Sequence, residues 1–307
     1  MKREGYNLIV ILGPTASGKT RVAARLARDL GSEVISSDSR QVYRGMDLGT
    51  GKDISEFLVD GVEVPYHLID IVDVGHEFNL FEYQKMFYRC FSEISGRGTI
   101  PVMAGGTGLY LEAVVKGYRM LEVPEDPALR GELQKMDMDT MRERFFKSNS
   151  ALHNTTDTQE RNRLVRAIEI AEHSKMHEFV EEVEHPLINP FIIGIRWERS
   201  VLRDRITARL KRRIDMGMIE EVKNLHDQGV SWKRLDSFGL EYRYVSRYLQ
   251  GRMDFDEMFK QLNTRIHQFS KRQMTWFRRM ERRGIVIHWM DNADYDSIKR
   301  LVREQVV

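Results

Sequence analysis

A glycine-rich segment near the start of the chain has the composition and spacing of a phosphate-binding loop. It reads Gly13-Pro14-Thr15-Ala16-Ser17-Gly18-Lys19-Thr20 and follows an apolar run at residues 8–12. Glycines at both ends let backbone N–H groups turn towards an anion, and the helix expected after the loop adds positive potential. Lys19 is placed to reach the terminal phosphates, and the hydroxyl of Thr20 is placed to bind Mg²⁺. The segment predicts a polyphosphate site and leaves open which phosphate compound binds there.

Two further polar segments follow apolar runs that we expect to be strands. They are Ser37-Asp38-Ser39-Arg40-Gln41 and Gly105-Gly106-Thr107-Gly108. The carboxylate of Asp38 suits a general base or a metal ligand, although an Asp-Ser pair serves equally well as a turn cap. The hydroxyl of Thr107 could donate to a phosphate oxygen, but glycine-rich turns are common. The second segment lacks the acidic residue that binds the metal in many nucleotide hydrolases, which disfavours that class.

The elements that would carry these segments alternate between short apolar runs and helical patterns. We expect strands at 8–12, 33–36, 67–71, 100–104 and 191–195, and helices at 20–30, 79–95, about 200–228 and 254–283. Such alternation predicts an α/β fold with a P-loop NTPase-like parallel sheet flanked by helices, which binds ligands at the carboxyl ends of its strands. A polar, helix-patterned stretch bounded by prolines predicts a helical insertion domain at 123–189. The predicted core domain comprises residues 1–122 and 190–307.

Charge is distributed unevenly along a chain whose net charge is only +2. Residues 191–284 contain 22 Lys and Arg against 12 Asp and Glu, a net charge of +10, so the other residues sum to −8. Arg265 and Arg272 lie on one face of the expected helix 254–283, with Lys271 beside it, and an apolar stripe that includes Phe269 is expected in the core. The basic face suits an anionic macromolecule, but a solvated helical surface explains the charge equally well.

Composition excludes several classes of protein. No apolar run approaches the roughly 20 residues that span a bilayer, and the first residues lack the apolar segment of a signal peptide. The single cysteine, Cys90, cannot form an internal disulfide, which suits a reducing compartment. The histidines show no zinc-binding spacing. We therefore expect a cytoplasmic protein with no membrane partner.

Together these motifs resemble those of the tRNA dimethylallyltransferase family, whose members are also known as tRNA isopentenyltransferases or IPP transferases. The resemblance covers nearly the whole chain and runs through residues 13–20, 37–52, 65–70, 105–110, 162–169, 264–265 and 271–276. Its most specific parts are the block 37–52, the Gly-Gly-Thr turn and the Lys-Arg-Gln-x-x-Trp motif at 271–276. The chain departs from the family pattern at Asp236, where many members carry arginine, and at 152–157, which lacks the usual His-Pro-Asn-Asp.

The resemblance implies a specific reaction and a set of site residues. The dimethylallyl group of dimethylallyl diphosphate would go to N6 of the adenosine 3′-adjacent to the anticodon, in tRNAs that read codons starting with U. Asp38 would be the general base, Thr107 would hydrogen-bond the leaving diphosphate, and Lys19 with Mg²⁺ on Thr20 would neutralise its charge. Residues 13–20, a loop of the ATP-binding type, would hold the diphosphate. The tRNA anticodon stem-loop would contact Asp38, Ser39, Arg40, Gln41, Thr107, Asn162, Arg163, Leu164, Val165, Arg166, Arg265, Lys271 and Arg272.

Besides a catalytically weakened tRNA-binding protein, which the missing arginine at position 236 would suggest, two alternative enzymatic functions stay open from the sequence. One is prenyl transfer to a free adenine nucleotide, which the long basic surface disfavours because a mononucleotide does not need it. The other is phosphoryl transfer by a small-molecule kinase with the same loop, for which we identify no contacts to an ATP base. We expect a monomeric enzyme of the bacterial type.

Overall fold

The computed structural model describes residues 5–118, 120, 122–148, 158–176 and 185–306. The chain divides into a core unit, Met1–Tyr118 with Pro186–Val307, and an insertion unit, Arg119–His185. The predicted domain limits lie a few residues further along the chain than these boundaries. The segment 152–157, where the sequence departs from the family pattern, lies outside the described residues.

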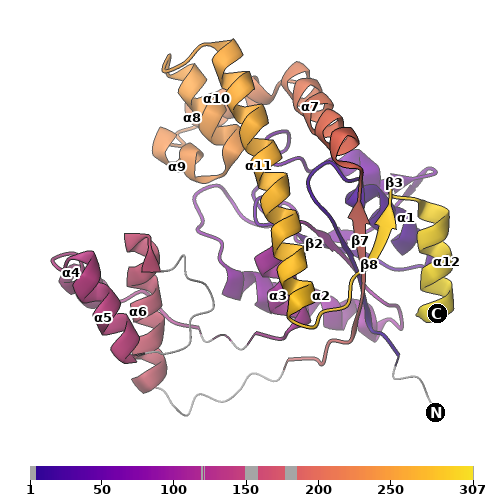
Figure 1. Cartoon of the computed structure of the whole chain (residues 1–307), viewed down its shortest axis with the longest axis horizontal. Helices are drawn as coiled ribbons and strands as arrows, with labels where there is room; N and C mark the ends of the chain where they lie inside the picture. Colours follow the sequence, from indigo (N-terminus) through magenta and orange to yellow (C-terminus); the bar gives the residue numbers. More distant parts are fainter. Residues whose placement is uncertain (1–4, 119, 121, 149–157, 177–184, 307) are drawn as a thin grey trace. The chain divides into compact units, whose positions relative to one another are not determined.

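The core unit is built on a six-stranded sheet whose strand order is β5-β2-β6-β1-β7-β8 (Figure 1). Its strands are β1 (Leu8–Leu12), β2 (Val34–Ser37), β5 (Tyr66–His67), β6 (Val102–Gly105), β7 (Pro190–Arg196) and β8 (His288–Asp291). All neighbouring strands run parallel, which confirms the predicted α/β class. A short antiparallel ribbon of β3 (Leu58–Val59) and β4 (Val62–Glu63) lies outside this sheet.

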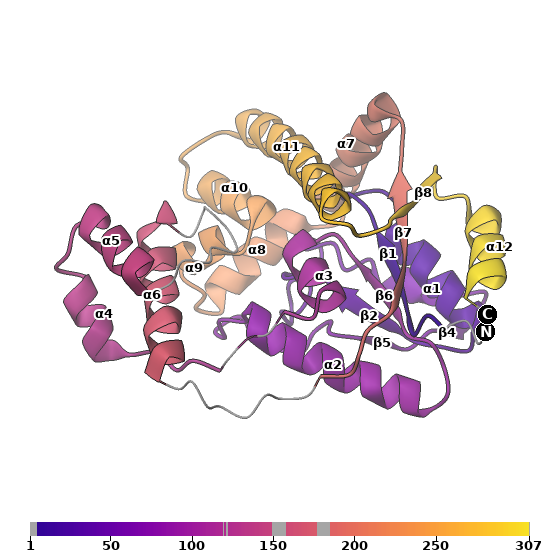
Figure 2. The same ribbon diagram turned by 60° about the horizontal axis from the view of Figure 1, so that its bottom comes forward.

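Helices cover both faces of the sheet, as two views of the chain show (Figures 1 and 2). Successive residues of a strand point to opposite faces, so Ile9 and Ile11 pack with α1 (Lys19–Asp29) and α12 (Tyr295–Gln305). On the other face, the remaining residues of β1 pack with α2 (Leu80–Gly96), α3 (Gly108–Val115) and α11 (Phe255–Arg282). Every residue of β1 is fully buried, which fixes the loop that follows it on a rigid support.

A group of helices lies beyond the carboxyl ends of the strands. It comprises α7 (Arg199–Asp215), α8 (Met218–Asp227), α9 (Trp232–Ser237), α10 (Leu240–Leu249) and the first half of α11. These helices share an apolar core with residues of the segment that follows β2, among them Val42, Tyr43 and Met46. The short helix η1 (Ile54–Phe57) ends that segment. The helices therefore hold the long loop after β2 in place.

Three sequence predictions are wrong in detail. The strand expected at 67–71 ends at His67, because Leu68 and Asp70 have φ angles of 62° and 55°, which no strand accommodates. The helix expected at 200–228 is divided into α7 and α8 at Gly217, whose φ is 103°. Phe269 is 39% exposed and therefore does not belong to the core; the guanidinium of Arg272 lies 5.8 Å from its ring.

The insertion unit contains α4 (Pro127–Leu133), α5 (Met138–Ser148) and α6 (Arg161–Met176) among its described residues. An ion-pair cluster crosses its interior. The buried carboxylate of Glu169 accepts hydrogen bonds from Arg130 (2.7 and 2.9 Å), from Arg166 (3.1 Å) and from the backbone N–H of Asp126 (3.0 Å). Leu164 is fully buried in the small apolar core. The tRNA contact that the resemblance implies for this residue stays a prediction.

Candidate active site

The phosphate loop (residues 13–20) joins β1 to α1 and is bent by two left-handed residues, Ala16 (φ 62°) and Gly18 (φ 86°). Two side chains hold its carbonyl groups. The indole N–H of Trp197 donates to the carbonyl of Ser17 (2.9 Å), and Nε of Arg205 donates to that of Ala16 (2.9 Å). The N–H groups in the first turn of α1 have no helical acceptor. The loop therefore offers an anion the donors at a helix N-terminus.

Positive side chains gather beside the loop in a cavity of about 540 Å³. Lys19, Thr20, Arg205 and Arg209 are among its lining residues. The pKa of Lys19 is lowered to about 8, mainly by burial and next by the repulsion of Arg209. Asp38 and other carboxylates act in the opposite direction. Arg209 also donates to the hydroxyl of Thr15 (3.2 Å). This surplus of positive charge suits a diphosphate.

An acidic residue on the loop after β2 fixes the position of Arg209. The carboxylate of Asp53 accepts a hydrogen bond from Arg209 and lies 3.9 Å from a nitrogen of Arg213. Burial alone would raise the pKa of Asp53, but the two arginines outweigh that effect and hold it below its usual value. Asp53 therefore remains ionised and keeps Arg209 oriented at the edge of the phosphate loop.

The strand ends bring Asp38 and Thr107 into one neighbourhood. β2 pairs with β6, and Ser37 lies opposite Gly105 in the register. Asp38 follows β2, and its carboxylate accepts from the backbone N–H groups of Arg40 (2.8 Å) and Gln41 (3.4 Å). The hydroxyl of Thr107 accepts from the N–H of Ser39 (3.3 Å). Because that bond uses an acceptor lone pair, the hydroxyl proton of Thr107 remains available to donate to a ligand oxygen.

Two glycines let the loop after β6 approach its neighbours closely. A Cβ atom on Gly105 would lie 2.1 Å from the carbonyl oxygen of Ser37, which excludes any side chain there. A Cβ atom on Gly106 would lie 3.2 Å from the carbonyl oxygen of Gly13 and 3.5 Å from Cε of Lys19. The Gly-Gly pair therefore places Thr107 beside both the Asp38 turn and the phosphate loop. The three predicted catalytic residues thus come together from three strand ends.

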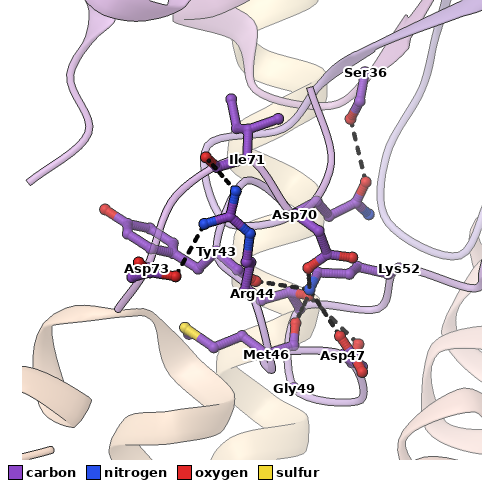
Figure 3. A network of polar contacts seen from close by, with 12 residues as sticks. Ser36, Tyr43, Arg44, Met46, Asp47, Gly49, Lys52, Asp70, Ile71 and Asp73 are labelled. Carbon is purple, nitrogen blue, oxygen red and sulfur yellow. Dashed lines mark hydrogen bonds and ion pairs between the residues drawn. The ribbon is translucent and has the colours of Figure 1, made fainter. Parts of the chain in front are cut away.

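The loop after β2 is anchored by a buried lysine (Figure 3). Nζ of Lys52 donates to the carbonyl of Tyr43 (2.7 Å), to the carboxylate of Asp47 (2.7 Å) and to that of Asp70. Gln41, which we predicted to contact tRNA, also bonds within the protein: its amide donates to the carbonyl of Gly51 (3.0 Å). These contacts give the loop that carries Asp38 a fixed shape.

Glu221 on α8 attaches the same loop to the helical group. Its carboxylate accepts from the backbone N–H groups of Asp47 (2.9 Å), Leu48 (2.7 Å) and Gly49 (3.0 Å). The hydroxyl of Tyr242 donates to the same carboxylate (2.7 Å). The loop is therefore held from both sides, by Lys52 within it and by Glu221 outside it.

The side chains beside the phosphate loop fit a magnesium ion that is held mainly by the oxygens of a bound diphosphate. Among the described residues, no group of three or more His, Cys, Asp or Glu side chains could hold a metal by itself. Thr20 lines the cavity beside Lys19. Mg²⁺ commonly keeps several waters and takes its other ligands from phosphate oxygens and one or two protein groups. Thr20 together with a bound diphosphate meets that requirement.

The predicted basic surfaces are exposed only in part. On α11, Arg265, Lys271 and Arg272 are exposed, and Arg265 bonds to the hydroxyl of Tyr244 (3.2 Å). In the insertion unit Asn162 and Arg163 are exposed, while Val165 is half-buried. Arg166 donates to Glu169 and to the carbonyl of Val123 (2.6 Å), so it already has protein partners.

Sequence reasoning missed the arginines that α7 contributes to the phosphate loop. Arg205 and Arg209 are four residues apart and therefore lie on one face of the helix, a spacing that could have indicated them. At the position of the expected arginine, Asp236 forms ion pairs with Arg243 (3.3 Å) and Arg247 (3.7 Å). Arg243 also donates to the backbone carbonyl of Asp236 (3.0 and 3.2 Å), so its guanidinium already has local partners.

Comparisons with known proteins identify relatives of this chain. The family model described as IPP transferase matches residues 41–280, and the model described as isopentenyl transferase matches residues 6–64. The chain is 56% identical to tRNA dimethylallyltransferase 1 of Syntrophus aciditrophicus over 297 residues, which cover 97% of each chain. It is 55% identical to tRNA dimethylallyltransferase 1 of Geotalea daltonii, with 94% of this chain and 92% of that protein covered.

A solved structure with a similar fold carries a related name. The chain resembles the crystal structure of the tRNA isopentenylpyrophosphate transferase of Bacillus halodurans with a TM-score of 0.70 and 32% identity, and the match covers 98% of this chain and 96% of that one. Family model, sequence identity and fold agree with the resemblance that the motifs suggest. The chain therefore belongs to the IPP transferase family.

Proposed function

We propose that the protein transfers the dimethylallyl group of dimethylallyl diphosphate to N6 of the adenosine 3′-adjacent to the anticodon in tRNAs that read codons starting with U. The observation that carries the proposal is the meeting of the phosphate loop, Asp38 and Thr107 at three strand ends. The relatives of this chain are named tRNA dimethylallyltransferases, which favours this function over a kinase or an enzyme acting on free nucleotides.

The reaction requires a diphosphate leaving group, an adenine amine and a base. As N6 bonds to C1 of the donor, the C1–O bond breaks and its electron pair stays with the diphosphate. Lys19 and the N–H groups of the phosphate loop stabilise the negative charge that develops, and Thr107 donates its hydroxyl proton to a diphosphate oxygen. Mg²⁺ held beside Thr20 would supply further positive charge at the same oxygens.

The proton lost from N6 needs an acceptor on the other side of the reacting carbon. Asp38 is the carboxylate at the strand end next to Thr107, and its backbone hydrogen bonds orient it. We assign it the role of general base. The products of the reaction are the N6-dimethylallyl adenosine of tRNA and inorganic diphosphate.

The tRNA would bind along exposed basic and polar residues. We assign this role to Arg265, Lys271 and Arg272 on α11 in the core unit, and to Asn162 and Arg163 in the insertion unit, since these side chains are exposed. Positive side chains on such surfaces bind the phosphate backbone, and the target base has to leave its stack to reach a buried site. We further propose that the enzyme acts as a monomer in the cytoplasm, where a chain with one cysteine stays reduced.

A two-acceptor assay tests the proposal. The protein is incubated with labelled dimethylallyl diphosphate, Mg²⁺ and either unmodified tRNA or AMP. We expect label in the tRNA and none in AMP. Label in AMP would instead indicate an enzyme acting on free nucleotides. Consumption of ATP in a parallel reaction, without use of the prenyl donor, would indicate a kinase.

A further inference from the structure

Gln273 on α11 connects two residues of the site, Thr15 and Gly106, that lie 91 positions apart in the sequence. Its side-chain carbonyl accepts a hydrogen bond from the backbone N–H of Thr15 in the phosphate loop (2.8 Å). Its side-chain NH₂ group donates to the carbonyl of Gly106 in the loop after β6 (2.9 Å). The neutral amide of Gln273 makes both bonds at once, because it has a donor and an acceptor on the same group.

The surroundings of Gln273 leave it little freedom. The residue is 7% exposed, and a Cβ atom on Gly106 would lie 2.4 Å from its amide nitrogen. One turn further along α11, the indole of Trp276 packs against Gly108, where an added Cβ would lie 2.4 Å from the ring. The helix α11 therefore contacts the segment 106–108 at two points, on either side of Thr107.

We propose that Gln273 is a positioning residue that fixes the distance between the phosphate loop and Thr107. The proposal rests on the proposed function in one respect: Thr107 and Lys19 must act on the same diphosphate. Gln273 has no role in the chemistry. It holds Thr15 and Gly106 so that Lys19 and the hydroxyl of Thr107 reach one leaving group together.

The physical reason is that both bonds satisfy backbone groups at the edge of the site. Without Gln273 the N–H of Thr15 and the carbonyl of Gly106 lose their partners, and each loop is free to shift. Displacements of about 1 Å in positioning groups can reduce a rate by about a hundredfold. We expect the exposed basic side chains of α11 to keep their positions, because the hydrogen bonds of the Gln273 side chain go to Thr15 and Gly106 and not to them.

Two variants and one control test this role. Gln273→Met keeps the length of the side chain and removes both polar atoms. Gln273→Glu keeps the acceptor for Thr15 but, when ionised, places a carboxylate against the carbonyl of Gly106. Gln261→Ala is the control: it removes from the same helix an amide that, among the described residues, donates to Glu257 (2.8 Å). Thermal unfolding of all variants confirms that they are folded.

The kinetic readout separates positioning from stability. We expect Gln273→Met to raise the KM for dimethylallyl diphosphate and lower kcat, with a loss of about tenfold to about a hundredfold in kcat/KM, at unchanged tRNA affinity. We expect the activity of Gln273→Glu relative to wild type to rise as the pH falls, because the protonated carboxyl group can donate to Gly106. A lower kcat with unchanged KM, or a relative activity of Gln273→Glu that does not vary with pH, would overturn the proposal.

Two measurements keep this test independent of prenyl transfer. Binding of inorganic diphosphate is measured by calorimetry, and exchange of the Thr15 amide is measured by NMR. We expect Gln273→Met to weaken diphosphate binding and to accelerate exchange at Thr15, while Gln261→Ala changes neither. If wild type transfers no prenyl group but these changes occur, the proposed function fails and the role of Gln273 stands. If both readouts match wild type, the role of Gln273 is refuted.

Discussion

The protonation state of Lys19 should set the pH range in which the site binds its diphosphate. The pKa of this lysine is lowered to about 8 by burial and by the repulsion of Arg209. Below this pH the side chain is charged and attracts the diphosphate; above it the charge is lost. Bound diphosphate favours the charged form, so binding takes up a proton at alkaline pH. Affinity should therefore fall as the pH rises through about 8.

The size of the effect follows from the pKa of about 8. Lys19 is charged in about nine of ten molecules at pH 7 and in about one of ten at pH 9. If only the charged form binds, the apparent Kd for dimethylallyl diphosphate rises about tenfold between these two pH values. The last phosphate proton of the ligand dissociates near pH 6, so the charge of the ligand itself stays nearly constant over this range.

A substitution at Arg209 distinguishes this cause from a general loss of charge. Arg209→Gln removes a charge that repels Lys19, so the pKa of Lys19 rises and the midpoint of the binding curve moves to higher pH. Affinity at pH 7 falls at the same time, because a positive group is lost beside the ligand. Lys211→Gln removes the same charge from an exposed position of α7 and serves as control. Calorimetry with dimethylallyl diphosphate, without tRNA, measures both quantities.

Two results would refute this reasoning. One is an affinity that stays constant between pH 7 and pH 9.5. The other is a midpoint in Arg209→Gln that equals or lies below that of wild type, since the repulsion by Arg209 would then not contribute to the pKa of Lys19.

Three further predictions concern the base, the tRNA surface and the anchored loop. Asp38→Ala should abolish transfer while tRNA affinity, measured by filter binding, stays nearly unchanged; normal turnover would remove Asp38 from the mechanism. Lys271→Ala with Arg272→Ala should weaken tRNA binding and reduce the slope of log K against log salt by about 1.4, and an unchanged slope would make this face an ordinary solvated surface. Lys52→Met should lower the free energy of unfolding by about 2 kcal/mol, because it leaves the carbonyl of Tyr43 and two carboxylates without their donor; urea titration measures this, and a loss below about 0.5 kcal/mol would contradict the role given to Lys52.

The parts of the fold that the sequence predicts are those set by local patterns. β1 is an unbroken apolar run before a glycine-rich loop, and α11 has a long amphipathic repeat, so both appear at nearly the predicted residues. β8 (His288–Asp291) was missed because four residues at the sheet edge carry little pattern. The strand expected at 67–71 fails because Asp70 turns back to meet Lys52, a contact that depends on the folded loop.

The residues of the candidate site also divide into those that local sequence patterns predict and those that depend on how the helices pack. The phosphate loop was predictable because its function resides in consecutive residues. Arg205, Arg209 and Gln273 were not assigned to it, because they reach the loop only when α7 and α11 pack against it. Asp38 and Thr107 were placed at strand ends by the alternation of strands and helices, and their closeness follows from the pairing of β2 with β6.

The most direct test of the proposed function uses two tRNA transcripts that differ at one base. One carries adenosine at the position 3′-adjacent to the anticodon, and the other carries guanosine there. With labelled dimethylallyl diphosphate and Mg²⁺, we predict that label enters only the first transcript and that mass spectrometry finds the prenyl group on that adenosine. Equal labelling of both transcripts, or a prenyl group on another nucleoside, would contradict the proposed function.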